Sequence, residues 1–155
     1  MTALTRPYWI EAQFERREGW DDAAYPFNLP AVRTLHSLPF HPNVTFLVGE
    51  NGSGKSTLIE ALAVAWGFNA EGGSKDHQFA THANHSVLHQ FIRPIRDGKA
   101  YAHDGFFLRA ESFFNVATYL EQTGGKRTGE RPLHEQSHGE AFFALFENRL
   151  MGDGL

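Results

Sequence analysis

Cysteine is absent from the 155 residues of this chain, which excludes a disulfide scaffold, a thiolate zinc site and a cysteine nucleophile. Long apolar runs are absent as well. The longest, 61–66 and 141–146, have six residues each, against about 20 for a membrane-spanning helix. The first ten residues lack the apolar centre of a secretion signal. We therefore expect a cytoplasmic protein with no membrane partner.

Excess positive charge is also missing. Fourteen Lys and Arg residues against eighteen Asp and Glu residues give a net charge of −4. This negative net charge argues against a protein that binds nucleic acid through its overall electrostatic field. DNA binding through a local basic patch remains open. The high aromatic content (14%) excludes a disordered chain. A length of 155 residues suits a single domain with its own core, so we treat 1–155 as one domain.

Strands alternate with helices along the chain, and this order indicates an α/β layered fold. The segment 44–48 (VTFLV) is apolar and β-rich, as in strands that are buried on both faces. From Lys55 the apolar residues follow a helical period until Gly67. The other expected elements are a strand in 8–17, an extended edge segment with a short strand in 25–35, strands at 86–92 and 105–116, a helix at 137–151, a variable insertion at 68–104 and a flexible loop at 121–136.

A glycine-rich stretch between this apolar strand and helix carries the most specific signal. It fits G-x-x-x-x-G-K-[ST] at every position, with Thr57 directly after it. Gly52 and Gly54 allow successive N–H groups to form an anion nest. Lys55 would reach the β- and γ-phosphates, and the Ser56 hydroxyl would ligate Mg²⁺. The nucleotide-binding residues are Gly49, Glu50, Asn51, Gly52, Ser53, Gly54, Lys55, Ser56 and Thr57.

The stretch 44–62 (VTFLVGENGSGKSTLIEAL) resembles the ATP-binding-cassette type of P-loop ATPase. More narrowly, it is similar to the soluble AAA-family ATPases related to the SMC and RecF proteins. The patches 105–117 and 133–143 look like the same bacterial subfamily. The resemblance implies a P-loop NTPase fold with N-terminal antiparallel strands, the ligands ATP and Mg²⁺, and ATPase activity.

The segment 136–140 (QSHGE) stands where the family has its signature, Leu-Ser-Gly-Gly-Gln. Ser137 and Gly139 match this signature, whereas Gln136, His138 and Glu140 depart from it. Read from the residues alone, Ser137 and Glu140 form a capping box at the start of an apolar helix. In the family, the signature of one subunit contacts the nucleotide of its partner. The resemblance thus implies a head-to-tail homodimer with two composite sites.

Two further positions are weaker candidates. Glu111 follows an apolar strand at about the place of the family's Q-loop glutamine, and an exposed strand residue explains it equally well. Arg33 lies in a segment whose arginines approach the nucleotide in related repair ATPases. A surface salt bridge is the preferred reading for this arginine.

The catalytic carboxylates of the family are missing from these residues. Cassette ATPases hold Mg²⁺ and position the attacking water with an apolar strand that ends in Asp-Glu. No such run occurs in 1–155, and Asp153 stands between glycines. We therefore expect a central sheet that is incomplete at the C-terminus, with 44–48 lacking a neighbour, and a chain truncated before this strand that hydrolyses ATP poorly.

The sequence leaves three functions open. The first is the N-terminal part of an ABC/AAA-type ATPase that binds Mg-ATP and needs the absent segment and a dimer for hydrolysis. The second is a regulatory or interaction module that binds nucleotide without hydrolysing it. The third is another P-loop enzyme such as a small kinase. A GTPase is disfavoured because no Asn-Lys-x-Asp occurs.

Overall fold

The computed structural model describes residues 8–73, 86–98, 102, 105–109, 139, 140 and 143. Two compact units divide the chain. The first comprises Met1–Ala70 and Thr81–Tyr101, and the second Glu71–Ala80 and Ala102–Leu155.

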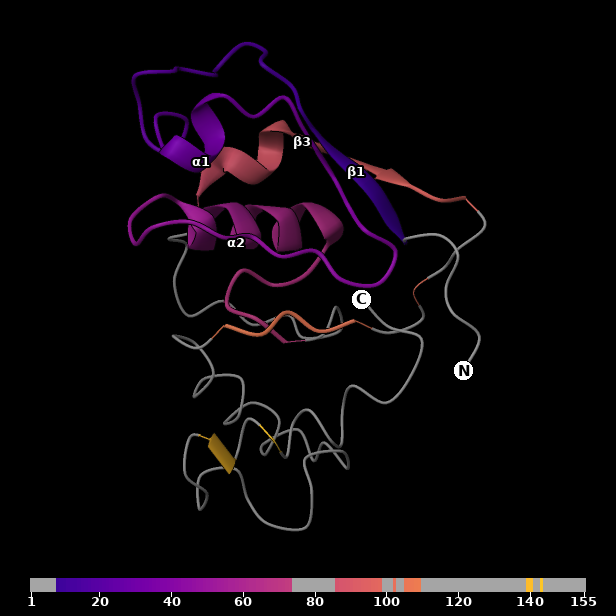
Figure 1. Cartoon of the computed structure of the whole chain (residues 1–155). Helices are drawn as coiled ribbons and strands as arrows, with labels where there is room; N and C mark the ends of the chain where they lie inside the picture. Colours follow the sequence, from indigo (N-terminus) through magenta and orange to yellow (C-terminus); the bar gives the residue numbers. More distant parts are fainter. Residues whose placement is uncertain are drawn as a thin grey trace. The chain divides into compact units, whose positions relative to one another are not determined.

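The first unit contains a small antiparallel sheet of three strands in the order β2-β1-β3. The central strand β1 (Trp9–Phe14) pairs with β2 (Ser37–Pro39) on one side and β3 (Ile92–Arg96) on the other. Figure 1 shows β1 and β3 running beside one another. The predicted N-terminal antiparallel strands, and the strand expected in 8–17, are therefore confirmed.

A bulge explains which side chains of β1 reach the core. Between Trp9 and Glu11 the register with β3 shifts, so that β1 carries one extra residue there. Side chains alternate between the two faces of a strand, so without the bulge Trp9 would lie on the face opposite Ala12 and Phe14. The extra residue places Trp9 on the same face as these two residues, and all three side chains are buried. Ile10, which falls within the bulge, is exposed.

The C-terminal end of helix α2 (Lys55–Trp66) packs against this sheet. Leu58, Leu62 and Trp66 are buried at helical spacing, and the helix ends at Gly67 as the sequence predicts. The Trp66 ring stacks on Trp9 with centroids 5.0 Å apart. On the same Trp66 ring lies the Arg96 guanidinium, 4.3 Å from the centroid. These contacts join the helix to both β1 and β3.

The expected extended segment and strand in 25–35 are wrong. Four residues there form the short helix α1 (Pro30–Arg33), and the strand β2 follows at Ser37–Pro39. Pro30 occupies the first helical position, where its missing N–H is no loss because that donor has no partner in a helix. The proline thus begins a helix instead of marking a sheet edge.

The expected strand at 86–92 is also wrong. Residues Val87–Phe91 form a 3-10 helix, η1, and β3 begins only at Ile92. The Ser86 hydroxyl accepts a hydrogen bond from the Leu88 N–H at 3.2 Å, which supports the turn over an extended backbone. β3 lies within the range 68–104.

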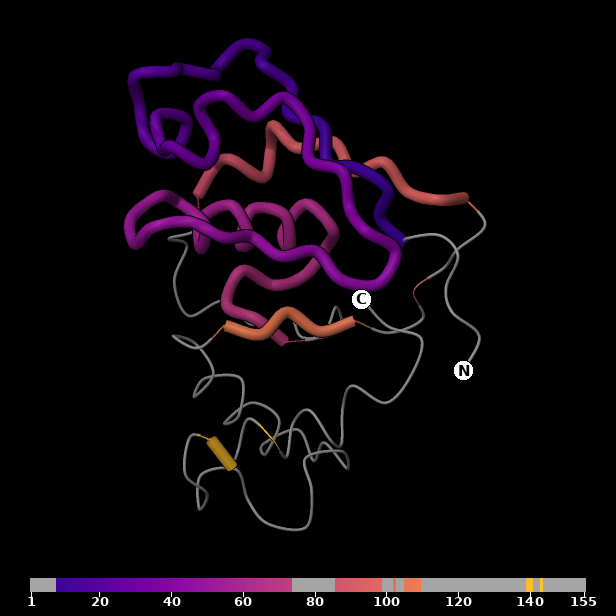
Figure 2. The backbone as a smooth tube through the Cα atoms, viewed as in Figure 1, coloured from indigo at the N-terminus to yellow at the C-terminus, as the bar shows by residue number. Residues whose placement is uncertain are grey.

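The segment 44–48 is not a buried strand, contrary to the prediction from its composition. Val44, Phe46 and Val48 are 55%, 82% and 92% exposed, and within the described part of the chain no backbone hydrogen bond reaches 45–48. The tube in Figure 2 follows the chain from β2 through this stretch into the glycine-rich loop. β-branched and aromatic residues favour a strand only when a neighbouring strand covers them. Among the described residues, no strand pairs with 44–48.

We predict that Phe46→Ser changes the free energy of unfolding by less than about 0.5 kcal/mol, because the Phe46 side chain is largely in solvent. The buried Phe27 is the matched control, and Phe27→Ser should cost about 3–5 kcal/mol. Urea unfolding of both variants measures the difference. A Phe46→Ser loss as large as that of Phe27→Ser would mean that 44–48 is buried in the folded protein.

Few residues of the second unit are described. Gly73 and Phe107 form an antiparallel bridge, with N···O distances of 2.8 and 2.9 Å between their backbones. This bridge lies in the expected strand 105–116, of which 110–116 is outside the described residues. Residues 139, 140 and 143 are helical, in agreement with the helix predicted at 137–151. In the described part of the chain, no helix combines the length and hydrophobicity needed to cross a bilayer.

Candidate nucleotide-binding site

The glycine-rich loop turns into helix α2 through two backbone conformations that favour glycine. Gly52 has φ of 79° and Gly54 has φ of 95°, both in the left-handed region. Gly54 is also the N-cap of α2, and its carbonyl accepts the first helical bond, from the Leu58 N–H at 2.9 Å. The sequence motif therefore forms the loop-to-helix junction that its glycines predict.

The Lys55 ammonium lies across this loop. Its Nζ donates to the carbonyl oxygens of Gly49 at 2.7 Å and Glu50 at 2.6 Å, and it lies 3.5 Å from the Ser53 hydroxyl oxygen. A positive charge is thus held against the backbone of the loop. All three acceptors are neutral, so the charge of Lys55 remains available to an anion that binds at the loop.

The N-terminus of α2 has no side-chain cap and no acidic residue in its first turn. The N–H groups of the first turn have no acceptor within a helix, and they form the positive end of the helix dipole. An anion at this end would meet these N–H donors and Lys55 together. The site therefore fits a phosphate chain.

The first turn of α2 also carries the hydroxyl groups of Ser56 and Thr57. Ser56 is exposed, which leaves its hydroxyl accessible to a metal ion carried by the phosphates. The Thr57 hydroxyl lies 3.4 Å from the hydroxyl of Tyr25. No cluster of three or more His, Asp or Glu side chains that could hold a metal occurs among the described residues. Within the motif, the Ser56 hydroxyl is the candidate ligand for Mg²⁺.

Residues far from the motif hold the loop from outside, and sequence reasoning missed them. The Ala31 N–H donates to the Ser53 carbonyl at 2.9 Å, and the Leu29 side chain lies against Gly54. Tyr25 and Ala31 lie 30 and 24 positions before Lys55 in the sequence. No pattern in the sequence links these positions to the loop. Only the fold brings them together.

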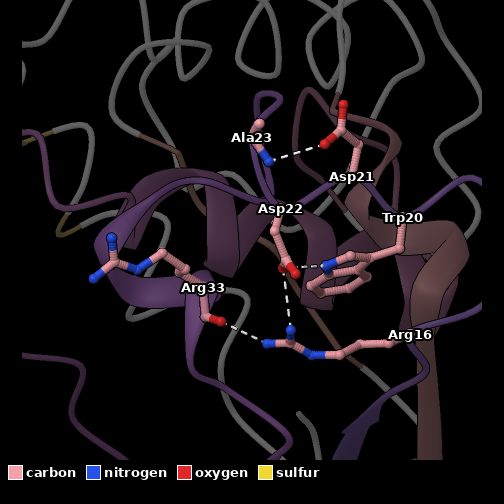
Figure 3. A network of polar contacts seen from close by, with 6 residues as sticks. All are labelled: Arg16, Trp20, Asp21, Asp22, Ala23 and Arg33. Carbon is pink, nitrogen blue, oxygen red and sulfur yellow. Dashed lines mark hydrogen bonds and ion pairs between the residues drawn. The ribbon is translucent and has the colours of Figure 1, made fainter.

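Arg33 contributes its backbone to a neighbouring network, which Figure 3 shows. The Arg33 carbonyl accepts a hydrogen bond from Arg16, and Arg16 pairs with Asp22 at 3.1 Å. The Trp20 indole N–H donates to the same Asp22 carboxylate at 2.8 Å. In Figure 3 the Arg33 guanidinium points away from this network. Among the described residues, Arg33 forms no ion pair, so the surface salt bridge expected for it is not seen there.

The remaining predicted site residues belong to the second unit. Glu111, Ser137 and His138 lie outside the described residues. Gly139 and Glu140 are helical and exposed. Their roles as a Q-loop equivalent and a signature therefore stay predictions.

A glycine-rich loop that runs into an uncapped helix, with its lysine folded over the loop, defines a P-loop domain. The AAA_23 family model, described as an AAA domain, matches residues 28–138, and the chain belongs to this family. This match confirms the resemblance to SMC-related AAA-family P-loop ATPases.

Curated relatives match over shorter stretches. One is the chromosome condensation protein dpy-27 of Caenorhabditis elegans, 56% identical over 47 residues, which cover 30% of this chain and 3% of the relative. Another is the structural maintenance of chromosomes protein 4 of Schizosaccharomyces pombe, 44% identical over 50 residues, or 28% of this chain and 4% of the relative. The chain thus spans a few per cent of the length of these relatives. No solved structure matches the chain.

Proposed function

We propose that this chain binds Mg-ATP on the loop 49–56. The observation that carries the proposal is the convergence of the Lys55 ammonium and the uncapped N-terminus of α2 on one loop. A nest of N–H donors with one mobile cation matches the charge of a triphosphate better than that of any neutral ligand. Membership of a P-loop ATPase family supports the same ligand.

Each part of the motif has a distinct role in this proposal. Backbone N–H groups from Gly52 to Thr57 would surround the phosphates, and Lys55 would exchange its carbonyl acceptors for phosphate oxygens. The Ser56 hydroxyl would ligate the Mg²⁺ that accompanies the nucleotide. When bound, Mg²⁺ neutralises phosphate charge and orients the phosphate oxygens.

Hydrolysis requires more than this loop. A carboxylate must complete the Mg²⁺ site and a further residue must position the attacking water. Within the 155 residues, no apolar run ends in Asp-Glu. We propose that turnover needs such a segment from another part of a longer protein or from another chain. On its own, the chain then acts as a nucleotide-binding module.

The family resemblance further supports a head-to-tail homodimer, in which Ser137, His138, Gly139 and Glu140 of one copy face the nucleotide of the other. Glu111 would then contribute near the Mg²⁺. These roles rest on the resemblance alone. The names of the curated relatives refer to chromosomes, which makes DNA the partner class to test.

Calorimetry with phosphate-release assays tests the proposal. We predict that Mg-ATP binds with one site per chain, and that AMP, which lacks the β- and γ-phosphates, binds far more weakly. Phosphate release should stay far below the range of about 1–10³ per second that is typical of enzymes. Equal affinities for Mg-ATP and AMP would refute nucleotide binding at this loop. Turnover at an ordinary enzymatic rate would refute the need for a further segment.

A further inference from the structure

Residues 25–31, which we call the loop clamp, contact the P-loop at three successive places. The Ala31 N–H donates to the Ser53 carbonyl at 2.9 Å. Leu29 lies so close to Gly54 that a Cβ at that glycine would be 3.0 Å from its side chain. The third contact joins the hydroxyl groups of Tyr25 and Thr57 at 3.4 Å. The clamp therefore follows the loop from its last turn into the first turn of α2.

The hydrogen bond between Ala31 and Ser53 fixes the direction of the Gly54 N–H. A peptide unit is planar and trans, so its C=O and the following N–H point in opposite directions. Because the Ser53 carbonyl is bonded to Ala31, the Gly54 N–H must point away from α1. This direction leaves the Gly54 N–H available to a phosphate oxygen.

The contact with Leu29 restrains the most flexible residue of the junction. Gly54 has φ of 95°, and a glycine can leave such a conformation at little cost. A side chain packed against its Cα removes much of this freedom before any ligand binds. Loops that are held in their bound conformation lose less entropy on binding, and their affinity is higher as a result.

The clamp itself is firmly attached to the first unit. Phe27 is buried and packs on Trp20 and Phe91, with ring centroids 4.5 and 5.0 Å away. Val32, the next residue after Ala31, is fully buried. At its far end, α1 is held through the hydrogen bond between the Arg33 carbonyl and Arg16 (Figure 3). The restraint on the P-loop therefore comes from the core.

We propose that the loop clamp is a positioning element, which raises the affinity of the P-loop for a triphosphate by holding Ser53, Gly54 and Thr57 in the anion-binding conformation. The proposal rests on the proposed binding of Mg-ATP at this loop. Leu29 makes the side-chain contact with Gly54 and is the positioning residue to test. Leu29 is only half-buried, so its replacement should not prevent folding.

Leu29→Ala should weaken the binding of both Mg-ATP and inorganic triphosphate by about tenfold, since one loop residue regains its backbone freedom. Leu29→Met restores the apolar contact and should bind within about twofold of the wild type. Isothermal titration calorimetry of the full chain gives both affinities. The two probes separate phosphate positioning from any contact with the nucleoside.

Leu88→Ala is the matched control, because it makes the same substitution at a fully buried position outside the clamp. This variant should lower the melting temperature at least as much as Leu29→Ala and leave the triphosphate affinity unchanged. If Leu29→Ala binds like the wild type, or if Leu88→Ala weakens binding equally, the clamp has no positioning role. Should Leu29→Ala show no melting transition, Leu29→Val carries the same test. Failure of the proposed Mg-ATP binding at the P-loop would give a different result from failure of the clamp proposal. In that case the wild type and Lys55→Ala would bind triphosphate equally.

Discussion

Replacing Lys55 with alanine is expected to weaken Mg-ATP binding by about 100-fold while leaving the fold intact. A hydrogen bond from a charged donor contributes about 1.5–3 kcal/mol, and two such bonds to phosphate at the lower end of this range account for about 3 kcal/mol, or a factor of roughly 100. Among the described residues, the ammonium bonds to loop carbonyls and a hydroxyl oxygen of the same loop. Calorimetry with Mg-ATP measures the loss, and thermal unfolding checks the fold.

Two control variants separate geometry from charge. Lys55→Arg keeps the positive charge, but its planar guanidinium cannot occupy the position of an ammonium between Gly49 and Glu50, so it should also bind poorly. Arg93→Ala removes a surface cation that pairs with Glu15 at 3.1 Å and should bind normally. An affinity of Lys55→Ala equal to that of the wild type would contradict nucleotide binding at the P-loop.

The P-loop and α2 could be predicted because their determinants are local. The glycines of the loop, Lys55 and the apolar period of the following helix all lie within 19 residues (49–67). Gly52 and Gly54 allow the left-handed conformations that the junction adopts, and Gly67 ends the helix. Local sequence was therefore sufficient for the loop-to-helix junction of the candidate site.

Elements whose structure depends on distant partners could not be predicted. The four residues of α1 are too few to show a helical period. The apolar run 44–48 has a strong β propensity, which expresses packing against neighbours and not an intrinsic backbone preference. Ser86 favours a turn by accepting the Leu88 N–H, and a count of apolar residues does not detect such a bond.

The same reasoning explains why the loop clamp was missed. Leu29 and Ala31 are ordinary residues in a proline-containing segment, and they contact a loop more than 20 positions later. Contacts of this kind follow from how α1 and α2 pack. A sequence pattern can identify which residues bind phosphate, but not which residues hold them in place.

Trp66→Ala is expected to cost about 3–5 kcal/mol in the free energy of unfolding, a large share of the 5–15 kcal/mol of a typical domain. Trp66 is buried, stacks on Trp9 and lies under the Arg96 guanidinium, so its removal leaves a cavity between α2 and the sheet. Aromatic stacking and the cation–π contact add to the loss. Urea unfolding, followed by the fluorescence of the remaining tryptophans, measures it.

Ile59→Ala is the matched control for this variant, because Ile59 lies in the same helix and is 42% exposed. Its cost should stay below about 1 kcal/mol, whereas Trp66→Phe, which keeps an aromatic ring, should fall between the two. A cost of less than about 1 kcal/mol for Trp66→Ala would mean that α2 is held by other contacts. Because the proposed phosphate site lies at the other end of α2, Trp66→Ala should also weaken Mg-ATP binding once the folded fraction falls. Lys55→Ala, in contrast, should weaken binding with the folded fraction unchanged, and this difference separates loss of the site from loss of the fold.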